Sequence, residues 1–201
     1  MVCLQGHEKE REDTFMARVL LLSKDQVGPE FQEVYQYIED HNAPILNIFK
    51  VLANCPSIGS EISKAGNAIL FNGSLPLSLR ELTILRVGNL TGSTYEWAQH
   101  VPIGMRMGLT EEQISTLSQW KDSSAFSDQE RAVLEYVDEV TLNIRVSEET
   151  FKAVMEFFTE EQVVELTILA GYYGMLARIL ESLEVELESD RDPNGIIWSK
   201  A

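Results

Sequence analysis

Of the three histidines in this 201-residue sequence, only His100 lies in an amphipathic helical pattern. His7 lies in a polar N-terminal stretch and His41 in a polar turn, where we expect solvent around both rings. A histidine on a helix face can transfer protons near neutral pH. The alternative is a structural histidine that bonds a backbone carbonyl, and Pro102 leaves the carbonyl of Ala98 without its helical donor.

Three polar residues are predicted to lie next to His100. Ser93 and Glu96 precede it by 7 and 4 residues, which places all three on one helix face. Gly92 is expected to end the preceding helix, so that the two helices form an antiparallel hairpin. With a rise of about 1.5 Å per residue, Glu81 lies roughly 16 Å above the turn and His100 roughly 12 Å. A difference of about 4 Å is within side-chain reach.

The segment Ser93-Thr-Tyr-Glu96 also has the spacing of a capping box, in which both side chains bond the first turn of a helix. That interpretation explains Ser93 and Glu96 without catalysis. Gly88, seven residues after Glu81, leaves a bare patch on the Glu81 face that a ligand or another backbone could approach.

Helix-start signals recur through the second half of the chain. A hydroxyl residue followed by acidic or amide residues satisfies free N–H groups and faces the positive end of the helix dipole. This pattern occurs at 110–113, 127–130, 147–150 and 159–162, and it explains much of the acidic excess. Gly73, Gly92 and Gly108 are expected to end helices. We predict helices at 29–40, 44–54, 57–71, 77–91, 94–107, 111–119, 128–144, 148–157 and 160–186.

The predicted fold class is all-α, because strand-like alternation is scarce and its best example, Val19–Leu22, is short. No linker rich in proline, glycine or serine divides the chain, so we expect one domain. Its predicted bounds are residues 26–188, preceded by a flexible N-terminal extension at 1–25 and followed by a C-terminal arm at 189–201.

A five-residue repeat links two of the predicted helices. The segment Glu81–Leu85 recurs letter for letter at Glu165–Leu169, either by chance or because two related core helices each carry a glutamate. The helix at 77–91 is apolar nearly all round, which predicts that it is buried. A glutamate on such a helix needs a partner or a function.

Composition excludes several classes of partner. Acidic residues outnumber basic ones by 32 to 16, and the formal net charge of −16 predicts neither nucleic-acid nor membrane binding. No apolar run approaches the roughly 20 residues of a membrane span, and the N-terminus lacks a signal-peptide pattern. The two cysteines, Cys3 and Cys55, are no disulfide framework, so we predict a reducing, cytoplasmic location. No metal-ligand cluster or cofactor fingerprint is found, and none is predicted.

One long stretch of the chain carries a series of motifs: it runs from Leu79-Arg-Glu-Leu-Thr-Ile-Leu-Arg-Val through Leu-Thr-Gly-Ser-Thr-Tyr-Glu-Trp-Ala-Gln-His-Val-Pro-Ile to Gly-Leu-Thr-Glu-Glu-Gln113. This stretch resembles the carboxymuconolactone decarboxylase family, which includes the alkylhydroperoxidase D-like proteins. The resemblance covers nearly all of the chain after residue 25. It implies a helical domain of the alkylhydroperoxidase D-like fold at 26–188 that assembles as a homo-oligomer (dimer, trimer or hexamer). Apolar residues beside the helices, among them Trp120, Phe126 and Trp198, favour the same expectation.

Within this resemblance the chain is similar to the thiol-free branch. The thiol branch carries glutamate, two cysteines and histidine at spacings that fall on Glu81, Ser93, Glu96 and His100. The acid and the histidine are kept, but oxygen side chains occupy both thiol positions. A peroxidase or disulfide reductase needs a thiolate nucleophile and a resolving thiol, so the redox function is disfavoured.

The resemblance therefore implies a cofactor-independent lyase or isomerase that acts on a small lactone or a small keto or enol acid. His100 would be the general acid and base, and Glu81 its orienting partner. Glu96 and Ser93 would contact the substrate or a water.

Aromatic side chains are predicted to line the substrate pocket. Tyr95 and Trp97 are the first candidates, and Tyr172 or Tyr173 the next; an apolar wall favours release of carbon dioxide from a desolvated carboxylate. Two alternatives to the lyase or isomerase remain. The first is a non-catalytic helical oligomer of the same fold, and the second is a residual peroxidase.

Overall fold

The computed structural model describes residues 17–188, so residues 1–16 of the predicted extension and the predicted arm at 189–201 lie outside the described residues. Between 17 and 188 the chain has helices and no strand, which confirms the all-α class. The elements are η1 (Lys24–Gln26), α1 (Pro29–Asp40), α2 (Asn47–Leu52), α3 (Pro56–Phe71), α4 (Leu77–Thr91), α5 (Thr94–Arg106), α6 (Glu111–Thr116), η2 (Leu117–Asp122), α7 (Asp128–Asn143), α8 (Glu148–Met155) and α9 (Glu160–Ser182).

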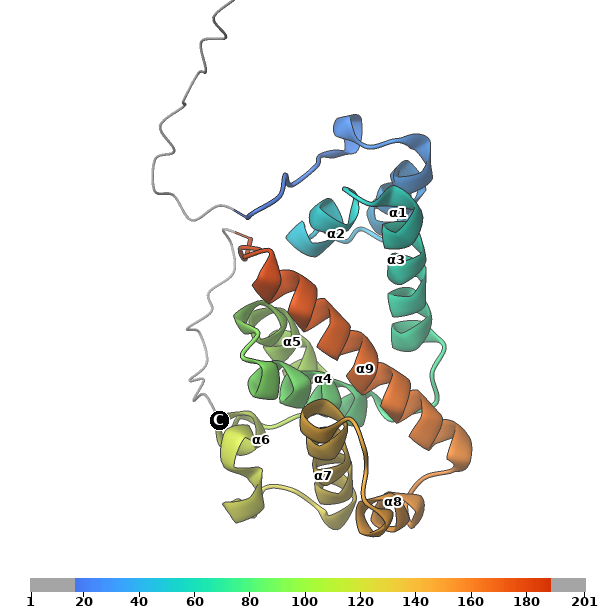
Figure 1. Ribbon diagram of the computed structural model, residues 1–201. Helices are drawn as coiled ribbons and strands as arrows, with labels where there is room; N and C mark the ends of the chain where they lie inside the picture. The colour runs from blue at the N-terminus through green and yellow to red at the C-terminus, as the bar shows by residue number, and fades with distance from the viewer. Residues whose placement is uncertain (1–16, 189–201) are drawn as a thin grey trace, which may run out of the picture.

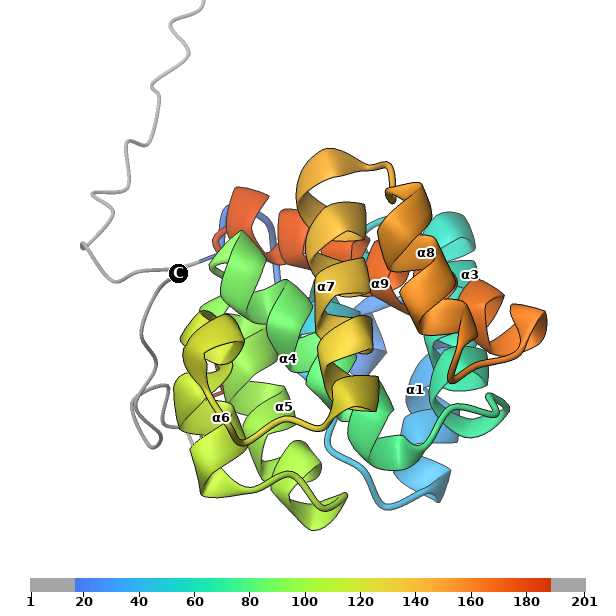
Figure 2. The same cartoon turned by 90° about the horizontal axis from the view of Figure 1, so that it is seen from below.

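Helix α4 lies at the centre of the fold, with α5, α7 and α9 packed around it (Figures 1 and 2). Most of its side chains are buried, including Glu81 and Arg86, as the apolar pattern at 77–91 predicts. Helix α9 runs diagonally across the molecule, with α1–α3 towards one end and α7 and α8 towards the other (Figure 1). The central position of α4 places its polar side chains in a dry interior, where each of them requires a partner.

The predicted helix starts are confirmed by their caps. In each, the hydroxyl accepts a hydrogen bond from the backbone N–H three residues later, which satisfies one of the free donors of the first turn. The capping residues are Thr110, Ser127, Ser147 and Thr159.

Two of the three predicted helix-ending glycines have the left-handed backbone that this role requires. Gly92 ends α4 with a φ of 74°, and Gly108 follows α5 with a φ of 106°. Gly73 is not among the positive-φ residues; a Cβ there would lie 2.1 Å from a carboxylate oxygen of Glu165. Close approach of the Glu165 carboxylate, rather than a turn, is therefore what favours glycine at 73.

Three predicted helices extend past the observed ones by three residues or more at one end. The helix predicted at 44–54 is the shorter α2, because Leu46 is still extended, with φ and ψ of −70° and 157°. The helix predicted at 111–119 gives way to the 3-10 segment η2, in which Gln119 has non-helical angles. The helix predicted at 160–186 ends at Ser182, and Glu184 turns the chain with a φ of 51°.

Residues 17–25, which were predicted to belong to the N-terminal extension, contact the helical domain. The N–H of Arg18 donates to the carbonyl of Leu183 at 2.8 Å. The carbonyl of Leu22 accepts from the hydroxyl of Tyr35 at 2.7 Å. These bonds join the segment before α1 to the end of α9 and to α1 itself.

Helix α9 corrects the expectation that no apolar run approaches membrane-spanning length. Among the described residues it is the one helix long and apolar enough, by length and composition, to cross a bilayer. Half of its most apolar window is buried inside the fold, where α9 packs against α4 and α7. The core helix of a packed domain has the same length and composition, and α9 occupies that place here.

Candidate functional site

The ring of His100 lies between two carboxylates. Its Nδ1 is 2.8 Å from Oε2 of Glu81 on α4, and its Nε2 is 3.5 Å from Oε2 of Glu96 on α5. Glu81 is fully buried, while Glu96 and His100 are 5% and 8% exposed. The juxtaposition predicted from the hairpin is therefore confirmed. Both ring nitrogens face carboxylates, so the ring of His100 is paired with Glu81 rather than with the Ala98 carbonyl.

The α4–α5 turn brings these side chains together. The N–H of Ser93 donates to the carbonyl of Gly88 at 2.9 Å, which closes the turn around Gly92. A Cβ at Gly88 would lie 3.5 Å from Cβ of Glu96 and 3.7 Å from the backbone N of Trp97. Of the two uses predicted for the bare patch at Gly88, the structure therefore shows the approach of another backbone, the first turn of α5.

Ser93 has no structural role that explains its hydroxyl. It precedes α5, but its side chain makes no capping bond, so the predicted capping box with Glu96 is wrong. Within residues 17–188, Oγ of Ser93 is buried and lacks a hydrogen-bond partner. Such a group costs about 1–3 kcal/mol relative to a paired one. The hydroxyl of Ser93 is thus a buried polar group that helix capping does not explain.

The carboxyl group of Glu96 is buried beside His100. Burial raises its pKa from the ordinary 4.5 to about 7, with a further contribution from the charge of Glu81, while His100 acts in the opposite direction. A carboxyl with this pKa exchanges its proton near neutral pH, which is the property a general acid or base requires.

Arg80 is a site residue that sequence reasoning missed. Its Nε lies 3.3 Å from Oε1 of Glu81, and its guanidinium also donates to the carbonyl of Leu70 at the end of α3. The available signal was a cation next to a glutamate on an otherwise apolar helix. Arg80 balances the buried negative charge of Glu81, so that this carboxylate has a cationic neighbour and a histidine neighbour.

Helix α9 supplies the aromatic cover of the site. The ring of Tyr173 meets that of His100 edge-on, with centroids 5.1 Å apart and an interplanar angle of 90°. Tyr172 packs 5.6 Å from Tyr173, and its hydroxyl donates to the carbonyl of Ile62. Burial raises the pKa of Tyr172 to about 12 and holds the pKa of Tyr173 well above its usual range, so both phenols stay neutral. Of the four aromatic residues predicted to line a pocket, Tyr173 contacts the ring of His100 and Tyr172 packs against Tyr173.

The other two predicted wall residues, Tyr95 and Trp97, are both on α5 and have other surroundings. The hydroxyl of Tyr95 donates to Glu188 at 2.7 Å and accepts from the N–H of Ile48, so it is engaged away from the His100 ring. Trp97 is 3% exposed and belongs to the hydrophobic core.

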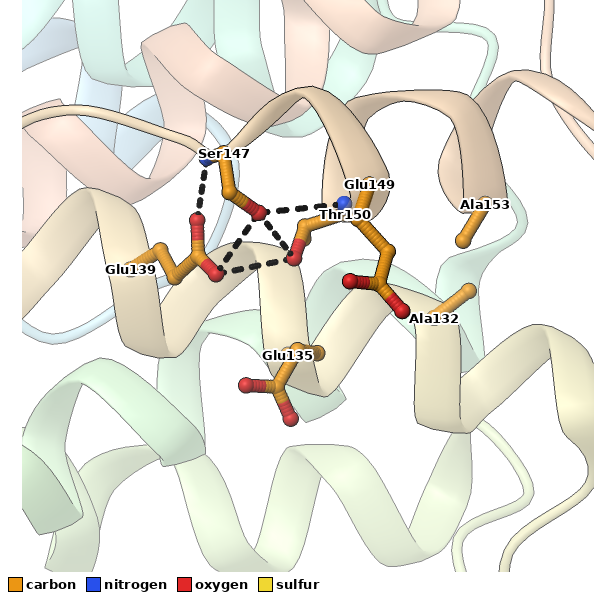
Figure 3. A pocket seen from close by; sticks show the side chains of 7 residues that line it. All are labelled: Ala132, Glu135, Glu139, Ser147, Glu149, Thr150 and Ala153. Atoms are coloured by element: carbon orange, nitrogen blue, oxygen red, sulfur yellow. Dashed lines mark hydrogen bonds between the residues drawn. The ribbon is translucent and has the colours of Figure 1, made fainter.

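A separate hollow of about 370 Å³ lies between α7 and α8 and is rich in acidic side chains (Figure 3). Its Glu139 accepts bonds from the N–H of Ser147, the hydroxyl of Ser147 and the hydroxyl of Thr150, which hold the start of α8. The first of these bonds lowers the pKa of Glu139. The carboxylate of Glu139 therefore stabilises the start of α8. In the part of the chain from 17 to 188, no group of three or more His, Cys, Asp and Glu side chains is placed to hold a metal ion.

A sequence model of the carboxymuconolactone decarboxylase family matches residues 56–139, the span that includes Glu81, Ser93, Glu96 and His100. The uncharacterized protein YdfG of Bacillus subtilis (strain 168) is 32% identical over 108 residues, which is 53% of this chain and 74% of the relative. The chain belongs to the carboxymuconolactone decarboxylase family.

Solved structures show the fold that this member of the carboxymuconolactone decarboxylase family shares. An uncharacterized peroxidase-related protein of Ralstonia eutropha JMP134, described as an alkylhydroperoxidase AhpD core, superimposes with a TM-score of 0.74 at 16% identity, covering 87% of this chain and 93% of that one. A peroxidase-related protein of Silicibacter sp. TM1040 also gives 0.74, at 12% identity, covering 91% and 96%. The apo debrominase Bmp8 gives 0.66 at 16% identity, covering 80% and 87%. The fold is therefore alkylhydroperoxidase D-like, as the sequence implies.

Proposed function

We propose that the protein is a cofactor-independent lyase or isomerase that acts on a small lactone or a small keto or enol acid. The observation that carries the proposal is the placement of His100 between Glu81 and Glu96 in a buried site. Membership of the carboxymuconolactone decarboxylase family supports the same reaction class.

In the proposed mechanism, Glu81 accepts the Nδ1–H of His100 and fixes the tautomer in which Nε2 exchanges the catalytic proton. In a decarboxylation, carbon dioxide leaves and its bonding electron pair stays on the substrate carbon, which then takes a proton from Nε2. The carboxylate of Glu81 stabilises the imidazolium from which that proton comes. In an isomerisation, His100 removes a proton from one atom and returns it to another.

Glu96 and Ser93 are assigned to substrate contact. The Nε2–Glu96 separation of 3.5 Å is too long for a strong hydrogen bond, so both groups remain able to bond a third one. A pKa of about 7 lets Glu96 return the proton that His100 gives away. The unpaired hydroxyl of Ser93 offers one donor to a substrate oxygen.

The peroxidase alternative depends on thiols that are not at this site. Ser93 and Glu96 occupy the two expected thiol positions, and Cys55 is exposed at the start of α3. Replacing Cys3 and Cys55 by serine should therefore leave turnover unchanged. Loss of a peroxide-dependent activity in that double variant would restore the redox function.

We also propose a homo-oligomer. The predicted contact residues Trp120 and Phe126 are 4% and 5% exposed, so they belong to the core and cannot support this expectation. Better support comes from Val164 and Ile168, which lie one turn apart on α9 and are 58% and 53% exposed. Light scattering at micromolar concentration should give a multiple of 22.7 kDa, and a monomer would contradict the proposal.

The proposed chemistry is tested with a panel of small lactones and keto or enol acids, followed by loss of substrate absorbance. His100→Gln keeps the volume and one hydrogen bond but removes the acid–base function, so turnover should fall by about 10²–10⁴-fold. The melting temperature is measured alongside. Normal turnover in His100→Gln would refute the assignment, and a folded protein inactive on every compound would favour the non-catalytic oligomer.

A further inference from the structure

The chain beyond α9 returns to the domain as a short segment, residues 185–188, which we call the strap. Glu184 reverses the chain with a φ of 51°, and the N–H of Val185 then donates to the carbonyl of Leu180 at 2.9 Å. The carbonyl of Glu186 accepts from the side-chain amide of Asn47 at 3.0 Å. The strap is therefore attached both to the end of α9 and to the start of α2.

The carboxylate of Glu188 joins the strap to two helices. Its Oε1 accepts the backbone N–H of Asn47 at 2.6 Å and the hydroxyl of Tyr95 at 2.7 Å, and its Oε2 accepts the side-chain amide of Gln99. Asn47 is the first residue of α2, and the preceding Leu46 provides no side-chain cap. Glu188 thus supplies an acceptor that the local sequence lacks.

Tyr95 and Gln99 form one face of α5, because they lie four residues apart. Both are buried, at 3% and 6% exposure. Burial, followed by the bond to Glu188 and its charge, raises the pKa of Tyr95, so that this phenol remains a donor at ordinary pH. The strap therefore bonds two neighbouring turns of α5.

Each of these residues is followed directly by a site residue. Glu96 follows Tyr95 and His100 follows Gln99, so the site face lies about 100° around the helix axis from the strap face. On the site face, α5 is bonded to Glu81 of α4. Contacts on two faces fix the rotation of a helix about its axis, which contacts on one face alone do not.

We propose that Glu188 is a positioning residue that fixes the rotation of α5 and thereby holds His100 against Glu81. Its effect on turnover rests on the proposed function, but its effect on the His100–Glu81 hydrogen bond does not. The strap lies far from these residues in sequence, at the other end of the domain chain, and its bonds to Tyr95 and Gln99 connect it to the site through α5.

The test uses the full-length, ¹⁵N-labelled protein and observes the ring Nδ1–H of His100 by NMR. The signal is assigned by its disappearance in His100→Gln, which is straightforward because the sequence has three histidines. In Glu188→Ala this resonance should be lost or broadened, because α5 loses the bonds that hold its second face. In Glu188→Gln it should persist: the new amide oxygen still accepts from Asn47 and Tyr95, and the amide of Gln99 can turn to accept in its place.

Glu186→Ala is the matched control in the same strap. Glu186 meets Asn47 through its backbone carbonyl, which this substitution leaves in place, so the His100 resonance should match the parent. A parent-like resonance in folded Glu188→Ala would overturn the proposal. If Glu188→Ala does not fold, Tyr95→Phe removes one of the three donors: a broadened resonance supports the proposal and an unchanged one overturns it.

Kinetics separate this proposal from the proposed function. With a substrate in hand, Glu188→Ala should lower kcat by about 10²-fold, the size of effect that misplacement by an ångström produces, with little change in KM. If no compound is turned over even by the parent, the proposed function fails, while the NMR comparison still decides the role of Glu188.

Discussion

Helices α4 and α9 contain the same five residues, Glu-Leu-Thr-Ile-Leu, and use the glutamate in opposite ways. Glu81 on α4 is fully buried and pairs with His100 and Arg80. Glu165 on α9 is half-buried, and its carboxylate accepts the backbone N–H groups of Ser74 and Leu75 in the loop before α4. One carboxylate is paired with titratable and charged groups, and the other closes a loop.

The remaining positions of the repeat differ by burial. Thr83 and Thr167 make the same bond, from the hydroxyl to the carbonyl four residues earlier. Ile84, however, is fully buried, whereas Ile168 is 53% exposed. The comparison shows that local sequence fixed the helix and the hydroxyl bond in both copies, while the neighbouring elements determined what the glutamate and isoleucine do. The repeat therefore provides matched pairs of substitutions.

The largest expected effect is on turnover, in the pair Glu81→Gln and Glu165→Gln. Glu81→Gln leaves His100 facing a neutral amide that cannot stabilise an imidazolium, so turnover should fall by about 10²-fold or more. Glu165→Gln should leave the turnover of folded protein unchanged, because Glu165 bonds a loop. The assay is substrate loss per folded molecule, and equal losses in both variants would show that Glu81 has no special role.

The next effect is on the free energy of unfolding, in the pair Ile84→Ala and Ile168→Ala. Ile84→Ala opens a cavity in the centre of the fold and should cost about 2–5 kcal/mol. Ile168→Ala should change the stability of the isolated chain by no more than about 0.5 kcal/mol. Urea titration at low protein concentration measures both, and a large loss for Ile168→Ala would locate Ile168 in an interface that persists at that dilution.

The third effect is on the pH dependence of the free energy of unfolding. It tests the electrostatics around Glu81, which has no counterpart around Glu165. The pKa of Glu96 is raised to about 7 in the folded chain, so the folded state binds more protons than the unfolded state between pH 4.5 and 7. Stability should therefore fall as the pH rises through this range, by up to about 3 kcal/mol from this group.

Glu96→Gln removes that titration, so its free energy of unfolding should depend less on pH than that of the parent. Urea titrations of both proteins at several values between pH 4.5 and 8 give the two slopes, and the remaining acidic groups cancel in the difference. Identical slopes would mean that Glu96 does not titrate in this range in the fold.

Sequence reasoning reached the α4–α5 hairpin because its determinants are local. Gly92 ends α4, the rise per residue is fixed, and these two facts alone bring Glu81 to His100. The caps at Thr110 and Thr159 were readable for the same reason. Patterns confined to one or two turns of helix were therefore enough to predict the fold class and the pairing of Glu81 with His100.

The parts that sequence reasoning missed depend on distant segments. Nothing near Ser93 in the sequence shows that its hydroxyl leaves the capping position unused, because that depends on how α4 and α5 pack. The engagement of Tyr95 with Glu188, 93 residues later, cannot be read from local periodicity. The cover of His100 by Tyr173 depends in the same way on α9 crossing the hairpin.

The most direct test of the account is a crystal structure with a non-reactive analogue of a small lactone or keto acid. We expect electron density for the analogue beside Nε2 of His100, within hydrogen-bond distance of Ser93 Oγ and Glu96. An analogue bound instead in the hollow between α7 and α8, with His100 still closed between its two glutamates, would contradict it (Figure 3).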